Sequence, residues 1–162
     1  MFHQYSNPTL KNVPKRPHLE VAIFKPLPLG YRKSKHYYFY GWAVTDEILK
    51  AYLIKQNIPV PRDSLHADVC AIQDLEQRSG YGFINLVGGK VNEEAKAQGR
   101  VVRTEEDAAL DVLAISCTRS HRLFWRRPTP RQLNILIELL GEEPRWFEDS
   151  ETKENFEMSL ME

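Results

Sequence analysis

Cysteine is scarce in this chain: Cys70 and Cys117 are the only two among 162 residues. So few cysteines cannot form the disulfide scaffold of a small secreted protein, and we expect both to be free thiols. Long apolar stretches are missing too, since none approaches the roughly 20 residues that a membrane span needs. The first twenty residues also lack the apolar core of a secretory signal. We therefore expect a soluble intracellular protein, cytoplasmic or nuclear, with no membrane partner.

The chain has no excess of either charge, because 22 basic residues balance 22 acidic ones. Its overall charge therefore does not select nucleic acid or anionic lipid as a partner. The charges are unevenly placed, however. Residues 1–17 contain lysine and arginine but no acid, which predicts a flexible basic arm. Residues 150–162 are acidic and poor in apolar side chains, which predicts a disordered acidic tail.

Hydrophobic residues make up 42% of the chain, which is enough to fill one core between these two ends. The apolar spacing predicts three strands and three helices: strands at 18–24, 37–43 and 81–87, and helices at 45–57, 63–80 and 129–141. Residues 110–117 fit either a helix or a fourth strand, and we favour the strand. Because strands and helices do not alternate strictly, we expect an α+β domain over residues 18–149. Its mostly antiparallel or mixed sheet would have about three to four strands backed by about three helices.

The last helix has the best-defined ends. Thr129 suits the N-cap, Pro130 the first helical position and Gly141 the residue after the last turn. Trp146 and Phe147 follow and are predicted to fold back over the end of the helix. Residues 127–147 resemble the closing segment of small proteins common in mushroom-forming fungi, a resemblance that favours a eukaryotic intracellular setting and implies no activity.

Four residues have the chemistry of zinc ligands. His66 and Cys70 are four positions apart, and Cys117 and His121 repeat that spacing in reverse. Two cysteines and two histidines are sufficient for a tetrahedral zinc site. The spacing nevertheless lacks the short knuckle between cysteines that zinc sites favour, and a lone cysteine beside an apolar stripe usually packs in the core. We therefore expect inert thiols and no cofactor, with structural zinc as the alternative.

A second candidate site is acidic. Gly88, Glu94, Glu106 and Asp107 partly resemble the Nudix box, in which a helix presents paired carboxylates to magnesium. The resemblance implies hydrolysis of a nucleoside-diphosphate-linked compound. The chain departs from the pattern at three positions: Gly99, Val102 and Arg103. Since acids also suit the positive end of a helix, a metal-assisted phosphate or nucleotide hydrolase is our alternative function.

The most distinctive segment is rich in arginine and aromatic residues and contains no acid. The segment contains Arg119, Arg122, Arg126 and Arg127, together with Trp125. Guanidinium groups bind phosphates and carboxylates, and aromatic rings stack on bases. The acidic tail also offers these arginines a partner within the chain. We predict that the segment binds another protein, in a non-catalytic interaction or scaffold domain, with nucleic acid as a further alternative and no catalytic residue assigned.

Overall fold

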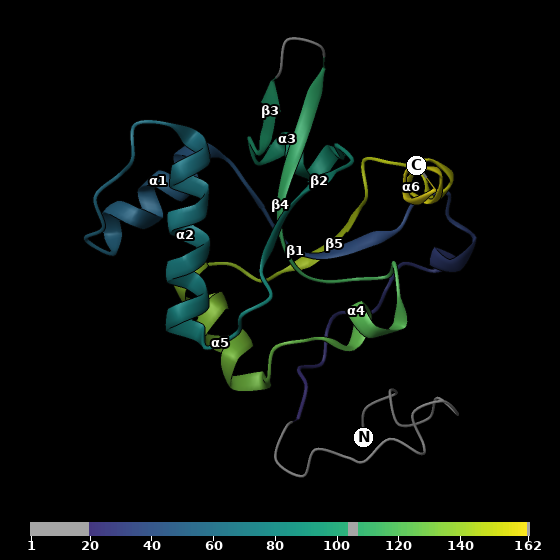
Figure 1. Cartoon of the computed structure of the whole chain (residues 1–162), viewed down its shortest axis with the longest axis horizontal. Helices are drawn as coiled ribbons and strands as arrows, with labels where there is room; N and C mark the ends of the chain where they lie inside the picture. Colours follow the sequence, from purple (N-terminus) through teal and green to yellow (C-terminus); the bar gives the residue numbers. More distant parts are fainter. Residues whose placement is uncertain (1–19, 104–106, 162) are drawn as a thin grey trace.

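The computed structural model of the chain describes residues 20–103 and 107–161 (Figure 1), so the predicted basic arm at 1–17 lies outside the described residues. Within the described residues the structure has five strands and six α-helices. The strands are β1 (Tyr38–Val44), β2 (Asn85–Gly89), β3 (Val101–Arg103), β4 (Ala108–Cys117) and β5 (Arg145–Glu148). The helices are α1 (Asp46–Lys55), α2 (Ser64–Ser79), α3 (Glu93–Ala97), α4 (His121–Trp125), α5 (Pro130–Leu140) and α6 (Lys153–Leu160). The predicted α+β class is confirmed, and the predicted numbers of strands and helices were too low.

The sheet is antiparallel, with the strand order β2-β4-β1-β5, and β3 pairs with the first residues of β4. The two outer strands of this order meet at one end. Gly89 bridges Asp149, and the Lys90 N–H donates to the carbonyl of Glu148 over 2.8 Å. The sheet therefore curls until the end of β2 touches the end of β5.

One face of the sheet carries the larger core. Helices α1, α2 and α5 lie together beside this face (Figure 1). Each helix begins at a side chain that accepts a hydrogen bond from the first turn: Thr45, Asp63 and Thr129. Their stripes meet the alternate residues of the central strands. The buried members from the sheet are Tyr40, Trp42, Val44, Leu113 and Ile115, and those from the helices include Leu53, Leu75 and Leu136.

The opposite face carries a smaller core. Its buried residues are Phe39, Ala43, Ala95, Leu110, Val112, Ala114, Cys117 and Phe147. Val87 of β2 and Leu123 of α4 pack against them. Because β2 and β4 are in register with Asn85 opposite Ala114 and Val87 opposite Val112, Asn85 projects from this same face.

The first predicted strand does not form, because residues 20–24 have no strand structure. Both edges of β1 are already paired, by β4 and by β5, which leaves this segment no free edge at β1. Ala22 instead donates one hydrogen bond to the carbonyl of Pro128 over 2.8 Å. The strand interpretation of 110–117 is confirmed by β4.

Three further local predictions differ from the structure. The strand expected at 81–87 begins only at Asn85, and the segment after Gly88, to which no predicted helix was assigned, contains α3. The aromatic pair Trp146 and Phe147 belongs to strand β5. Each difference arises where pairing or packing with a distant segment overrides a weak local pattern.

The segment predicted as an acidic disordered tail contains helix α6. Thr152 caps it by accepting from the Asn155 N–H. The ring of Phe156 lies edge-on to Tyr37, 5.7 Å between centroids, and the backbone N–H of Lys153 donates to Lys35 over 2.7 Å. Ring contacts of Tyr37 and Phe156 and a few hydrogen bonds therefore hold this segment. In the described part of the chain, no helix combines the length and apolarity required to cross a membrane.

Candidate functional site

The arginine-rich segment begins where β4 ends. Ser120 caps α4 by accepting from the Leu123 N–H over 3.1 Å, and the Ser116 hydroxyl donates to the carbonyl of Phe124 over 2.9 Å. These contacts tie the short helix to the sheet. The chain then continues without helix or strand through residues 126–129 into α5.

The side chain of Arg127 makes contacts that stabilise the fold. Its Nε donates to the carbonyl of Phe124 over 3.0 Å and its Nη1 to that of Ala22 over 3.2 Å. The guanidinium carbon lies 4.1, 4.5 and 4.4 Å from the ring centroids of Phe24, Phe124 and Trp125. Burial lowers the pKa of Arg127 to about 10, because removal from water disfavours the charged form. This arginine joins three parts of the fold, and its Nε and Nη1 donors are used within the chain.

Arg119 is also held within the chain. Its Nη2 lies 2.8 Å from Oδ2 of Asp149, and its guanidinium carbon lies 4.9 Å from the Phe39 ring centroid and 4.1 Å from that of Phe156. Among buried side-chain nitrogen and oxygen atoms of the described residues, Nε of Arg119 alone has no hydrogen-bond partner. Asp149 lies just before the predicted acidic tail at 150–162, so this ion pair is not the predicted contact; the tail itself reaches Arg119 through the ring of Phe156.

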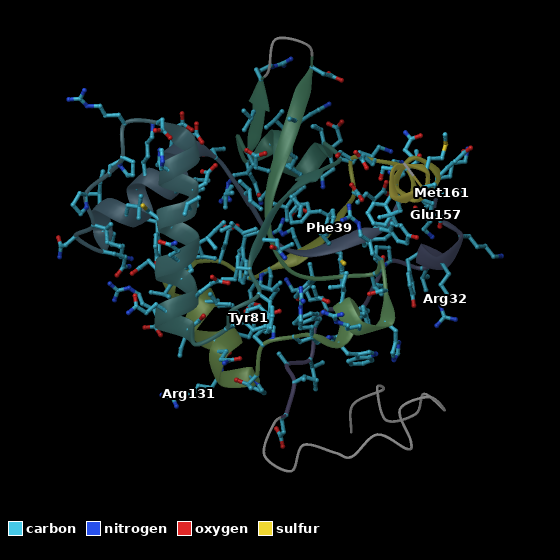
Figure 2. All side chains as sticks on the ribbon, viewed as in Figure 1. Arg32, Phe39, Tyr81, Arg131, Glu157 and Met161 are labelled. Carbon is cyan, nitrogen blue, oxygen red and sulfur yellow. The ribbon has the colours of Figure 1, made fainter. Side chains whose placement is uncertain are left out.

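Arg122 and Arg126 are different, because neither forms an ion pair with a described acidic residue. Arg122 is exposed on α4. The guanidinium carbon of Arg126 lies 4.3 Å from the ring centroid of Phe83, a side chain that is 50% exposed. Arg131, at the start of α5, is exposed and lies apart from this group (Figure 2).

Arg119 and Arg126 line the same pocket, which has a volume of about 270 Å³ and opens on the smaller-core face of the sheet. The full lining is Phe39, Phe83, Asn85, Leu86, Val87, Ala114, Ile115, Ser116, Cys117, Arg119, Leu123 and Arg126. It therefore combines an apolar floor with two guanidinium groups and contains no carboxylate.

Cys117 lies in the wall of this pocket. Burial raises the pKa of its thiol, and the positive charges of Arg119 and Arg126 act in the opposite direction. Cys117, Arg119 and Arg126 all line the same pocket. Since burial prevails, the thiol stays protonated at neutral pH and is not poised as a nucleophile.

The predicted zinc ligands do not meet. Cys70 packs against the larger core and Cys117 belongs to the smaller one, so the sheet lies between them. His66 is at the surface, its Nδ1 within 2.5 Å of Asp63, and His121 lies edge-on to Trp125. Among the described residues, no three histidine, cysteine or acidic side chains are grouped as metal ligands.

The acidic candidate site is not assembled in the described residues either. Glu94 lies on α3 and forms an ion pair with Arg145 of β5, so a cationic side chain occupies its carboxylate. Asp107 accepts from the Ala108 N–H just before β4, and Glu106 lies outside the described residues. The helix that the Nudix box requires is absent at 101–103, where β3 runs instead.

Sequence reasoning missed three lining residues of the pocket, Phe39, Phe83 and Asn85. It also missed Asp149, which pairs with Arg119 and is not part of the lining. In β2, Asn85, Val87 and Gly89 are two positions apart and therefore lie on one face. A polar and an apolar side chain on the same face is a weak indication of a binding surface. Nothing in the local sequence pairs them with Arg119, since that contact depends on the curl of the sheet.

The chain matches no protein-family model, no curated protein and no solved structure. The geometry of the arginine segment and its pocket is therefore the available indication of function. The resemblance of residues 127–147 to fungal proteins stays a prediction.

Proposed function

We propose that this protein is a non-catalytic protein-interaction domain that binds an acidic segment of a partner protein. The binding surface consists of Arg122, Trp125 and Arg126, with Phe83 at its border. The observation that carries the proposal is that Arg122 and Arg126 have no carboxylate partner among the described residues.

The rigidity of this surface supports the proposal. The guanidinium group of Arg127 packs against the rings of Phe124 and Trp125. The Ser116 hydroxyl of β4 donates a hydrogen bond to the carbonyl of Phe124. A surface that is ordered before binding loses little conformational entropy when a partner arrives. Arginine and tryptophan are also the side chains that most often dominate interface energies.

Nucleic acid is the weaker partner for this surface. Binding to a phosphate backbone usually recruits many cations at once, whereas only Arg122 and Arg126 are unpaired on this surface and the chain has no net positive charge. No observation in the described residues favours the metal-assisted hydrolase, because Glu94 is engaged by Arg145.

The test is binding of fluorescent peptides that combine glutamate or aspartate with one aromatic residue, measured by anisotropy. Arg122→Glu should weaken binding at least about tenfold, since it replaces attraction by repulsion at the surface. Lys55→Glu makes the same charge change at an exposed position on α1 and should change affinity less than about twofold. Equal losses in both variants would show that only net charge matters. Tighter binding of a single-stranded oligonucleotide, lost in Arg122→Glu, would assign the surface to nucleic acid.

A further inference from the structure

The pocket beside the arginine segment has its own chemistry, separate from the exposed surface of α4. Two of its lining side chains, Arg119 and Arg126, are cationic, and none is acidic. Asp149 neutralises Arg119 from behind. Arg126 is left with one positive charge that no described carboxylate balances. The two arginines and Asp149 together leave one positive charge at the pocket, which matches a ligand with a single negative charge.

The rest of the lining selects an apolar body for that ligand. Val87 and Leu123 pack with Phe39 and Ala114 in the smaller core, and all four also line the pocket. A small hydrated ion would gain nothing from such a wall, whereas a hydrocarbon group gains about 25 cal/mol for each Å² that leaves water. A cation next to an apolar floor is the usual arrangement for an amphipathic organic acid.

The size of the pocket limits the ligand further. Its volume of about 270 Å³ is just below the range of roughly 300–1,000 Å³ typical of sites for drug-sized molecules. One aromatic ring or a short branched chain fits that space. A nucleoside phosphate is disfavoured, because it carries more negative charge than the single free guanidinium can balance.

We propose that the pocket binds a small organic monocarboxylate, with the carboxylate facing Arg126 and the apolar body lying against Val87 and Leu123. The same chemistry is offered by a free aryl or short-chain acid and by the C-terminal residue of a protein. The pocket shares Arg126 and Phe83 with the proposed partner surface, whereas Arg122 and Trp125 are not part of its lining.

The test is calorimetric titration of the full chain with phenylacetate, and with its neutral counterpart phenylacetamide. Phenylacetate should bind with one site per chain and at least about tenfold more tightly than the amide, the usual size of one charge-assisted hydrogen bond. Arg126→Leu should lose about tenfold in affinity, and Arg122→Leu, a matched change outside the pocket, less than about twofold.

A second variant keeps the test decisive if Arg126→Leu folds poorly. Asn85 is exposed at the pocket rim, on an outer strand, so Asn85→Phe is tolerated by the fold and covers the mouth. Binding should then fall at least about tenfold. Alkylation of Cys117 gives a second readout, measured in proteins that carry Cys70→Ser. Saturating phenylacetate should slow this alkylation when Asn85 is present and should not change its rate in the Asn85→Phe variant.

N-acetyl-phenylalanine and its amide distinguish the two sources. A protein C-terminus is indicated if N-acetyl-phenylalanine binds more tightly than phenylacetate and its amide does not bind. A free acid is indicated if phenylacetate binds more tightly than N-acetyl-phenylalanine. Equal binding of phenylacetate and phenylacetamide would overturn the proposal, as would no saturable binding of either acid up to about 10 mM. Binding of phenylacetate without binding of the acidic peptides would support the pocket and contradict the partner surface. Binding of the acidic peptides without binding of phenylacetate would support the partner surface and contradict the pocket.

Discussion

Arg119 and Asp149 form an ion pair, with 2.8 Å between Nη2 and Oδ2, that joins the end of β4 to the chain leaving β5. The side chain of Asp149 is only 3% exposed and that of Arg119 is 25% exposed. The pair fastens the strand that closes the curl of the sheet, because Asp149 also bridges Gly89. It places a neutralised cation in the pocket wall and leaves the unbalanced charge to Arg126.

Asp149→Asn should therefore destabilise the fold. The amide keeps the shape of the side chain but leaves the Arg119 cation unpaired in a mostly buried position, at a cost of about 2–3 kcal/mol. Urea unfolding followed by circular dichroism measures this loss. Glu151→Gln, an exposed change two residues away, should alter the free energy of unfolding by less than about 0.5 kcal/mol. A near-zero effect of Asp149→Asn would show that the pair does not hold the sheet closed.

Arg127 should matter for stability more than for binding. Arg127→Ala removes two hydrogen bonds to carbonyl groups and three ring contacts, which predicts a loss of about 3 kcal/mol. Arg127→Lys keeps the charge but not the planar fork, and we expect an intermediate loss of about 1–2 kcal/mol. The matched surface change Arg122→Ala should cost less than about 0.5 kcal/mol. If Arg122→Ala were the more destabilising substitution, the assigned roles would be reversed.

Gly41 should tolerate no side chain. A Cβ atom at this position of β1 would lie 1.8 Å from the carbonyl oxygen of Leu113 in the paired strand. Gly41→Ala should therefore cost more than about 4 kcal/mol or abolish folding. Gly82 provides the control, since a Cβ there meets nothing within 4 Å, and Gly82→Ala should be neutral or stabilise by up to about 1 kcal/mol. A normally folded Gly41→Ala protein, judged by its melting temperature, would contradict the close pairing of β1 with β4.

Asp111 predicts a dependence of stability on pH. Burial and then the charge of Asp46 raise the pKa of Asp111 above its usual value. Between the unfolded pKa of about 3.9 and the raised folded pKa, the folded state binds more protons than the unfolded state. Stability therefore falls as the pH rises through this window, and the penalty stays constant at higher pH.

Asp111→Asn removes that penalty and should therefore stabilise the protein at pH 7. The gain should shrink towards pH 4 and below, where the parent carboxyl is protonated. Urea unfolding at several pH values measures the difference. The exposed change Glu138→Gln on α5 should show no such trend, and a gain that is independent of pH would contradict the assigned cause.

Sequence patterns predicted the elements that depend on neighbouring residues. Capping residues mark the start of α1, α2 and α5, because each cap acts on backbone groups within one turn. The apolar run of β4 identified the central strand, although helix was the alternative. The same patterns did not find β3, α3 or α6. Strand β3 has only three residues, and α3 and α6 are held partly by contacts with distant residues.

Composition and spacing by themselves determined the α+β class, the amphipathic helices and the arginine–aromatic segment as the feature to explain. Only the tertiary structure decided that Arg127 is half-buried among rings, that Arg119 is neutralised by Asp149, and that Arg126 lines a pocket with Val87 and Leu123. The reason is physical. Capping and amphipathic periodicity act over a few residues, whereas the burial and pairing of a charge depend on strands that meet only when the sheet curls.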